Sequence, residues 1–329
     1  MIDKVSDKLF FKLLQTNVHQ YSGDCIDEFY QYLISKYPDN VFIKDVGWLK
    51  FKVLWIGIFR RLLRYFKPRI LLPINKKINF SAQIGPDLKM CIPDFFLARQ
   101  NYIYMFDAWP RFHHELGEMF DLMNVKTVFF SSRDVTYHYQ KNTDSICKAY
   151  WVPEGINATE YHYLPYTDKT IDVLEFGRTY KSYHDIIVGP LAEARKQHLF
   201  TTADKRILFE TKLEFKNALS KTKICICVPS NITHPERAEN ISTMTLRYLQ
   251  CMASKCLIVG IMPPEMNELF DYMPMIEIDS ENPGLQIMDI LTNYESYHHI
   301  IERNYQIVNE KHQWLNRWKF IEEIIKKEI

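Results

Sequence analysis

Glycine is scarce in this chain of 329 residues, which contains only 10 of them. Loops that wrap around a phosphate usually depend on closely spaced glycines, and neither GxGxxG nor GxxxxGK[ST] occurs in the sequence. The two common glycine-rich phosphate loops are therefore excluded. A bound phosphate would have to be held by cations and by the start of a helix instead.

Patterns that indicate a metal or a disulfide framework are also missing. The seven cysteines are odd in number, scattered along the chain and mostly within apolar runs. Their spacing matches neither a disulfide scaffold nor a zinc motif. No DxD-type pair of carboxylates is present either, so we predict no metal site.

The chain has no surplus of one charge and no long apolar run. Its 41 basic and 40 acidic residues give a net charge of +1, which argues against nucleic acid as a partner. The start, MIDKVSDKLFF, is too charged for a secretory signal. No stretch reaches the roughly 18 apolar residues that a membrane-spanning helix needs. We therefore expect a reducing, cytoplasmic setting.

Short apolar runs alternate with amphipathic segments over most of the chain. We expect residues 1 to about 40 to be helical, and a helix at 183–198. We expect strands at 41–43, 101–106, 126–130, 149–152, 171–176, 224–228, 256–259 and 275–278. This alternation is typical of α/β folds with parallel, doubly wound sheets, and the length suggests about two domains.

Ligands of such sheets bind beyond the carboxyl ends of the strands. Asp107 directly follows the strand at 101–106, and a carboxylate is an unusual end for a buried run. His113 and His114 follow in the next helix, where only one of two adjacent side chains can face the crevice. We take Asp107 and His114 as the candidate catalytic residues, although each one alone is more often structural.

The segment from Val46 to Pro86 contains no acidic residue and alternates basic with aromatic side chains. We expect a helix at about 49–66 that lies on an anionic membrane surface, with basic groups on phosphates and rings at the interface. The residues assigned to this contact are Trp55, Arg60, Arg61 and Arg64. The alternatives are a core helix with a solvated basic face and, less favoured, a nucleic-acid contact.

Two segments of the second half could hold an anion. Gly177 permits a tight turn, and Arg178 with Lys181 brings two cations to the start of the helix at 183–198. The alternative is a solvated basic turn. Further on, a polar loop leads into a helix expected at 243–253, which Ser242 or Thr243 would cap. Arg247 and Gln250 share one face of it. The alternative is one more ordinary helix–strand unit.

Three segments carry a family resemblance. Val152–Asn157 (VPEGIN) looks like a V-P-N-G-I-D turn, and Asp172–Arg178 (DVLEFGR) looks like a V-x-F-V-G-R strand. Arg247–Ala253 with Cys256–Val259 looks like R-x-F-E-x-x-A-x-G-x-x-V-V. In this order the sequence resembles glycosyltransferases of the GT-B fold, in the family 1 and family 4-like group that includes spore-maturation-type enzymes.

The resemblance implies two facing Rossmann-like domains with a deep cleft between them. It implies an acceptor domain at 1–160, a donor domain at 161–310, and a helix at 311–329 that packs back on the first domain. In the family's E-x7-E motif, Ser242 stands for the first glutamate and Gln250 for the second, which binds the donor ribose. Lys255 replaces the family glycine. The implied donor-site residues are Gly177, Arg178, Lys181, Ser242, Thr243, Arg247 and Gln250.

The resemblance further implies a metal-independent transferase with no cofactor and a nucleotide-sugar donor such as a UDP- or GDP-sugar. The implied acceptor is a glycan or a lipid-linked sugar at the cytoplasmic membrane face, in bacterial capsule or O-antigen synthesis. If the reaction inverts, a base must deprotonate the acceptor, and Asp107 or His114 would serve. If it retains, both only bind acceptor. The rival functions are a nucleotide-sugar epimerase of the same architecture and a non-catalytic nucleotide- or sugar-binding protein.

Overall fold

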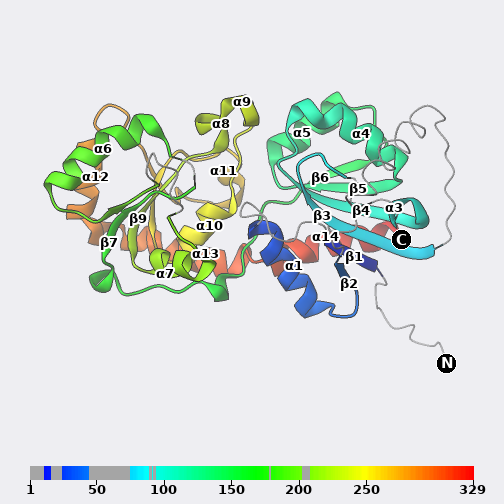
Figure 1. Ribbon diagram of the computed structural model, residues 1–329, viewed down its shortest axis with the longest axis horizontal. Helices are drawn as coiled ribbons and strands as arrows, with labels where there is room; N and C mark the ends of the chain where they lie inside the picture. The colour runs from blue at the N-terminus through cyan, green and yellow to red at the C-terminus, as the bar shows by residue number, and fades with distance from the viewer. Residues whose placement is uncertain are drawn as a thin grey trace. The chain divides into compact units, whose positions relative to one another are not determined.

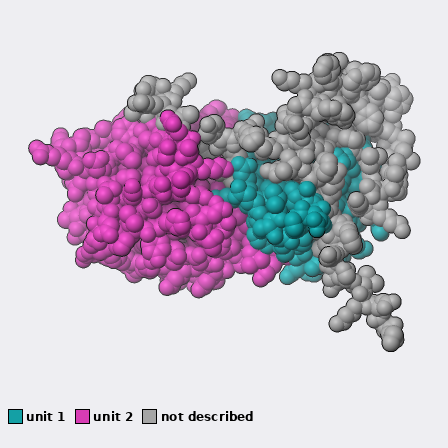
Figure 2. Space-filling view, turned by 60° about the horizontal axis from the view of Figure 1, so that its bottom comes forward, with its two compact units in different colours: residues 1–152, 321–329 teal, residues 153–320 magenta. Residues whose placement is uncertain are grey.

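The structure is a computed structural model that describes residues 11–15, 24–43, 75–88, 91, 94–177, 179–201 and 208–329. The chain divides into two compact units, coloured separately in Figure 2. Unit 1 is formed by residues 1–152 with 321–329, and unit 2 by residues 153–320. Each unit is an α/β layer structure of its own (Figure 1).

Unit 1 is built on a parallel sheet with the strand order β2-β1-β3-β4-β5-β6 over the described residues. The apolar runs of β4 and β5 form strands because both faces of the sheet are covered, so almost every side chain is buried. The strands are β1 (Phe11–Gln15), β2 (Val41–Ile43), β3 (Asn75–Ile84), β4 (Ala98–Phe106), β5 (Val125–Phe130) and β6 (Lys148–Trp151). The helices include α1 (Asp24–Lys36), α3 (Asp94–Leu97), α4 (His113–Leu122) and α5 (Arg133–Asn142).

The register of unit 1 brings the ends of its central strands level. Ile84 lies opposite Phe106, and Met105 lies opposite Phe130. Asp107 and Ser131, each the first residue after its strand, therefore lie at one edge of the sheet.

Unit 2 repeats this design with a parallel sheet of order β11-β10-β9-β7-β8 in the described part. Its strands are β7 (Ile171–Leu174), β8 (His198–Leu199), β9 (Thr222–Cys227), β10 (Leu257–Gly260) and β11 (Ile276–Glu277). Its helices are α6 (Lys181–Glu193), α7 (Lys212–Ser220), α8 (Ser230–Thr233), α9 (Pro235–Ala238), α10 (Leu246–Ala253), α11 (Met266–Leu269), α12 (Pro283–Thr292) and α13 (His298–Lys311). Helices α6 and α12 pack together on one face of the sheet, and α10 packs with α13 (Figure 1).

The last helix, α14 (Trp314–Glu328), contributes to both units, because the division falls between Phe320 and Ile321. Its final turn is held in unit 1 by Glu328, whose carboxylate accepts a hydrogen bond from Thr127 Oγ1 at 2.8 Å. The same carboxylate pairs with Lys148 Nζ at 2.8 Å. One turn and a half earlier, Glu322 accepts from the Tyr37 hydroxyl at 2.7 Å.

Two expectations for the secondary structure are wrong. Phe11–Gln15 is a strand and not part of a helix. It pairs with both β2 and β3, and this pairing outweighs the helical spacing of its apolar residues. His198 is likewise on strand β8, because α6 already ends at Glu193.

Residues 46–74 of the basic aromatic segment lie outside the described residues, and these include the expected helix at 49–66 with Trp55, Arg60, Arg61 and Arg64. In the part of the chain that is described, no helix combines the length and the apolar character needed to cross a membrane.

Candidate functional site

The strand order of unit 2 reverses between β7 and β9. From β7 the chain first adds β8 on one side and then β9, β10 and β11 on the other. In doubly wound sheets the ligand crevice lies at such a switch point, beyond the carboxyl ends of the two strands. The residues at these ends are Glu175–Gly177 after β7 and Val228–Asn231 after β9.

Gly177 forms the turn after β7 with a φ of +77°, a left-handed conformation that favours glycine. The guanidinium of Arg247 packs directly on Gly177. A Cβ added at this glycine would lie only 2.3 Å from Arg247 Nη2, so no other residue fits here without moving the arginine. The same guanidinium lies 5.4 Å from the centre of the Phe176 ring, within the range of a cation–π contact. Among the described residues, no carboxylate forms an ion pair with Arg247, so its charge faces the switch point without a protein counter-ion.

The loop before α10 is held by Glu265, which is fully buried. Its Oε1 accepts a hydrogen bond from Thr243 Oγ1 at 2.8 Å and another from the Met244 N–H at 2.5 Å. Glu265 is the N-cap residue of α11, so one buried carboxylate fixes this loop against the start of that helix. Ser242 and Thr243 are both buried as a result.

The first turn of α10 is capped by Glu154, whose Oε2 accepts from the Leu246 N–H at 2.6 Å. A carboxylate at this position satisfies one of the free N–H groups and complements the helix dipole. Glu154 is 7% exposed, and Arg317 Nε donates to its backbone carbonyl at 3.2 Å.

Three sequence motifs therefore meet at the start of α10. The turn 152–157 contributes Glu154, the segment 172–178 contributes Phe176 and Gly177, and the helix itself contributes Arg247. They are separated by up to about a hundred residues in the chain, so their meeting is a property of the fold and not of local sequence.

The predicted start of this helix needs correction. Helix α10 begins at Leu246 and not at Thr243, and its N-cap is Thr245, which makes no side-chain capping bond. Neither Ser242 nor Thr243 caps it, because Glu265 holds the preceding loop in a non-helical conformation. The Met244 and Leu246 N–H groups, expected to face an external anion, are bound by the protein's own carboxylates.

The other predicted donor-site residues lie as follows. Gln250 is 5% exposed, and its Nε2 donates to the Tyr161 hydroxyl at 3.0 Å. Lys181 is the first residue of α6, and it pairs in solvent with Asp185 at 2.7 Å. Arg178 lies outside the described residues.

Two polar residues in the short helix α8, which follows β9, were not predicted. Ser230 Oγ and Asn231 Oδ1 are buried and have no hydrogen-bond partner in the described part of the chain. Buried polar atoms are nearly always paired, so an unpaired one at a switch point marks where a ligand could bind. Their only sequence signal was the position after an apolar strand.

In unit 1, Asp107 follows β4 with a φ of +52°, an uncommon conformation for a residue other than glycine. The two adjacent histidines differ in exposure. His113 is buried, donates from Nε2 to the Ala108 carbonyl at 2.9 Å and stacks near Phe130, whereas His114 is exposed. His114 is therefore the one of the pair that is open to solvent, and its role at a ligand stays a prediction.

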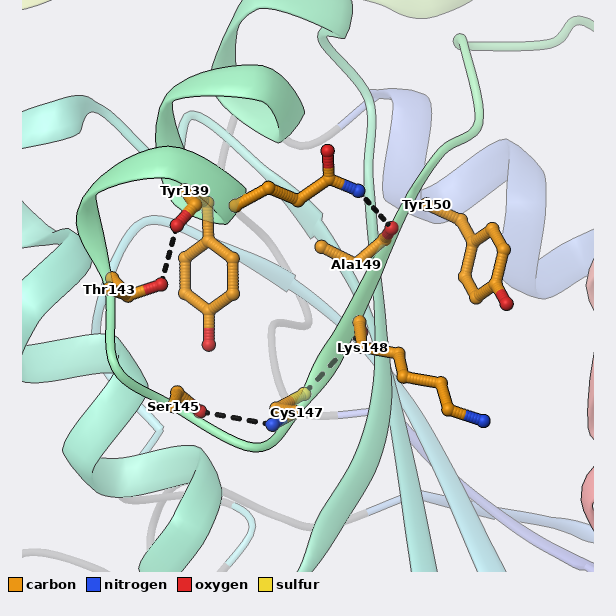
Figure 3. Close-up of a pocket in the computed structure, with 8 residues that line it drawn as sticks. Tyr139, Thr143, Ser145, Cys147, Lys148, Ala149 and Tyr150 are labelled. Atoms are coloured by element: carbon orange, nitrogen blue, oxygen red, sulfur yellow. Dashed lines mark hydrogen bonds between the residues drawn. The ribbon is translucent and has the colours of Figure 1, made fainter.

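Two open surface pockets lie away from these residues. A pocket of 330 Å³ in unit 1 lies between the end of α5 and the start of β6 (Figure 3). Tyr139, Cys147 and Lys148 line it, and Gln140 Nε2 donates across it to the Ala149 carbonyl at 2.9 Å. A second pocket, of 410 Å³, includes Lys223 at the start of β9. Both lie at the amino ends of strands, so we place the candidate site by topology rather than by cavity size.

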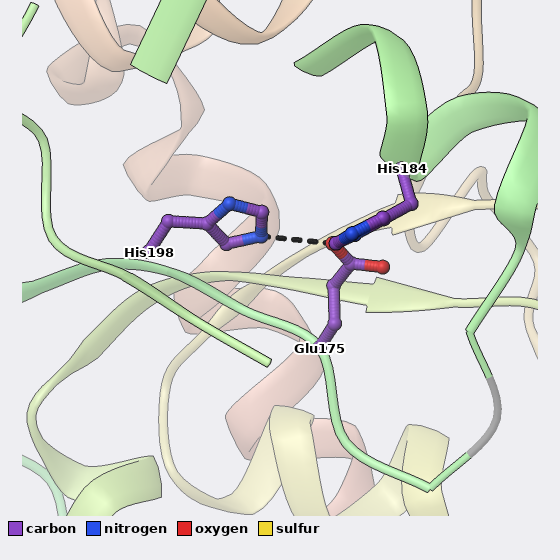
Figure 4. Close-up of side chains that lie close together, drawn as sticks. All are labelled: Glu175, His184 and His198. Carbon is purple, nitrogen blue, oxygen red and sulfur yellow. Dashed lines mark hydrogen bonds and ion pairs between the residues drawn. The ribbon is translucent and has the colours of Figure 1, made fainter. Parts of the chain in front are cut away.

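Among the described residues, a cluster formed by Glu175, His184 and His198 has the composition of a metal site (Figure 4). The sequence analysis predicted no such site.

No protein-family model and no curated protein matches the chain. Among solved structures, Anabaena Alr3699/HepE in complex with UDP-glucose is similar with a TM-score of 0.59 and 10% identity, covering 96% of this chain and 99% of HepE. A glycosyltransferase from Rickettsia africae ESF-5 has a TM-score of 0.58 and 12% identity over 96% of this chain and 98% of its own. Sucrose-phosphate synthase from Thermosynechococcus elongatus has a TM-score of 0.51 and 9% identity, over 88% and 81% of the two chains. The predicted GT-B fold, with two Rossmann-like α/β domains, is thereby confirmed.

Proposed function

We propose that this chain is a glycosyltransferase that moves a sugar from a nucleotide-sugar donor to a glycan or lipid-linked acceptor. The observation that carries the proposal is the meeting of three motif segments at the start of α10, which leaves the Arg247 cation at the switch point of unit 2. The fold shared with HepE, which was crystallised with UDP-glucose, supports a nucleotide sugar as donor.

In this proposal unit 2 holds the donor. The leaving nucleoside diphosphate gains negative charge as the glycosidic bond breaks, and a fixed cation stabilises that charge. Arg247 would supply the cation together with Arg178 and Lys181, so that transfer proceeds without a metal. Gln250 would hydrogen-bond the ribose, and Tyr161, its present partner, would orient it.

Unit 1 would hold the acceptor at the carboxyl edge of its sheet. Asp107 and His114 are the candidates for a base that deprotonates the acceptor hydroxyl in an inverting reaction. If the enzyme retains configuration, the same residues would bind the acceptor only. Substituting Asp107 with Asn separates the two outcomes, because an inverting enzyme would lose kcat while a retaining one would change mainly in the acceptor KM.

We further propose that the basic aromatic segment brings the enzyme to the cytoplasmic face of an anionic membrane, where bacterial capsule or O-antigen precursors are assembled. This part of the proposal rests on the sequence of residues 46–86. Reversing Arg60, Arg61 and Arg64 to Glu should abolish co-sedimentation with anionic liposomes and leave neutral liposomes unaffected. Unchanged sedimentation would favour the alternative that this segment is a core helix with a solvated basic face.

The first test is thermal stabilisation of the full chain by UDP, GDP, CMP, ADP and TDP, with NAD as a control. We expect a shift with one nucleoside diphosphate, because a ligand that binds only the folded state raises its stability. Arg247→Ala should lose the shift with the diphosphate but keep the weaker binding of the free nucleoside. Arg178→Ala should behave alike, and equal losses for both ligands would contradict a phosphate role.

Turnover with the matching nucleotide sugar then separates the rival functions. A transferase releases nucleoside diphosphate and needs an acceptor, whereas an epimerase gives an isomerised nucleotide sugar without one. Binding without turnover would identify a nucleotide-binding protein. In a transferase, Gln250→Ala should raise the donor KM, and an unchanged KM would remove Gln250 from the ribose site.

A further inference from the structure

The cluster of Glu175, His184 and His198 joins three separate elements of unit 2. Glu175 follows β7, His184 lies in the first turn of α6, and His198 lies on the edge strand β8. His184 Nδ1 is 2.6 Å and His198 Nε2 is 2.8 Å from the same oxygen, Glu175 Oε1 (Figure 4). The three candidate ligand atoms all lie within 4.8 Å of one another.

Glu175 brings one buried carboxylate to this cluster, and its partners among the described residues are the two histidines. The Glu175 side chain is 2% exposed, and among the described residues no lysine or arginine forms an ion pair with it. A buried carboxylate is costly unless it is paired with a positive charge. Each imidazole lies within hydrogen-bonding distance of this carboxylate, and a divalent cation bound among the three groups would supply a fixed positive charge.

We propose that this cluster is a binding site for a divalent transition-metal ion of the zinc class. Two imidazole nitrogens and one carboxylate oxygen are ligands that Zn²⁺ prefers. In a tetrahedral zinc site such atoms lie roughly 3.4 Å apart, so the observed 2.6 and 2.8 Å require only a small outward shift of the side chains. The partly exposed side of His184 leaves room for water as a fourth ligand.

The role of the metal would be structural and separate from the proposed transfer chemistry. It would tie β7 to α6 and to β8, which is only two residues long. It would also fix the chain just before Gly177, where Arg247 packs. The Phe200 ring closes the cluster on another side, with its centre 4.6 Å and 4.7 Å from the two imidazole rings.

Zinc binding by the full chain tests this proposal directly. The protein is stripped with a chelator, dialysed and titrated calorimetrically with ZnCl2 alone. We expect one equivalent per chain, and a rise in melting temperature on loading. Glu175→Gln keeps an acceptor oxygen for both histidines but removes the charge, so it should weaken zinc binding by about 100-fold. His299→Asn, which changes an exposed histidine outside the cluster, should bind like wild type.

Cobalt substitution distinguishes the proposed site from binding at cysteines, because the seven cysteines of the chain are also potential ligands. Co²⁺ in the proposed site should give visible absorption bands of low coordination without a sulfur charge-transfer band. A sulfur band, no stoichiometric binding, or equal zinc affinity in wild type and Glu175→Gln would each overturn the proposal. If Glu175→Gln does not fold, His184→Asn provides the same comparison at the most exposed of the three ligands. None of these measurements depends on glycosyl transfer, so the two proposals fail separately.

Discussion

Replacing Glu265 by Ala should loosen the loop before α10. The substitution removes the acceptor of two buried donors, the Thr243 hydroxyl and the Met244 N–H. A buried donor left unsatisfied costs about 1–3 kcal/mol. The two donors together give a loss of about 2–4 kcal/mol at this loop, if water entering the vacated space recovers part of the cost.

Glu265→Gln separates charge from hydrogen bonding at the same position. The amide oxygen can still accept both hydrogen bonds, but charge-assisted bonds are roughly twice as strong as neutral ones. We therefore expect a smaller loss of about 1 kcal/mol, given the usual worth of a neutral hydrogen bond. Asn267→Ala removes an exposed polar side chain two residues away and should change stability by less than about 0.5 kcal/mol.

Amide hydrogen exchange of the segment 242–250, followed by mass spectrometry on the full chain, measures this local opening. Protection at Met244 should fall about 30- to 1,000-fold in Glu265→Ala, which converts the 2–4 kcal/mol at about 1.4 kcal/mol per tenfold. Nucleotide binding should weaken with it, since Arg247 follows directly on this loop. Unchanged exchange in a folded Glu265→Ala protein would refute the reasoning, because the loop would then be held by other groups.

Three further substitutions test other contacts. Gly177→Ala should lower the free energy of unfolding by roughly 1–2 kcal/mol because of its left-handed φ, and it should displace the Arg247 guanidinium. The affinity for a nucleoside diphosphate, measured by calorimetry, should therefore fall. Gly189→Ala is the control and should not lower this affinity, because the space around an added Cβ is open. Gly260→Ala would place a Cβ 1.7 Å from the Cys227 carbonyl oxygen, so soluble yield should collapse, and a normal yield with an unchanged melting temperature would contradict this packing. Burial, together with the nearby Arg317 cation, lowers the pKa of His312 to about 3. Below pH 6.5 the unfolded chain therefore binds a proton at this histidine while the folded chain does not. The free energy of unfolding should therefore fall as pH drops from about 6.5 towards 3, by up to about 1.4 kcal/mol per pH unit, and His312→Gln should flatten this slope in urea titrations.

The central strands of the sheets could be predicted because nearly all their side chains are apolar and buried, a pattern that is visible in the sequence itself. Runs such as Asn101–Phe106 and Lys126–Phe130 are apolar on both faces, which only a strand covered on both sides explains. Phe11–Gln15 was assigned to a helix because its apolar residues fit both periods. Its pairing with β2 and β3 decides the matter, and pairing is not visible in a short segment.

Sequence motifs predicted individual residues of the candidate site but not the contacts between residues that are distant in the chain. Gly177 and Arg247 were singled out from their own motifs, but their direct contact depends on how β7 and α10 are placed by the sheet. Glu154 and Glu265 went unassigned because a buried carboxylate and an exposed one look alike in sequence. Glu175, His184 and His198 are 9 and 14 residues apart, a spacing that matches no zinc motif, since three separate elements bring them together.

The division of helix α14 between the two units has a consequence for synthesis of the protein. Every residue of unit 2 has been made by Phe320, whereas unit 1 still lacks residues 321–329. Glu322 and Glu328, which bind Tyr37, Thr127 and Lys148, leave the ribosome only after the whole of 153–320. At about 5–20 residues per second, roughly ten to thirty seconds pass between the synthesis of Val152 and that of Ile321, where unit 1 resumes. The half that is translated first is therefore completed last, and Tyr37, Thr127 and Lys148 lack these glutamate partners until the end of α14 has been made.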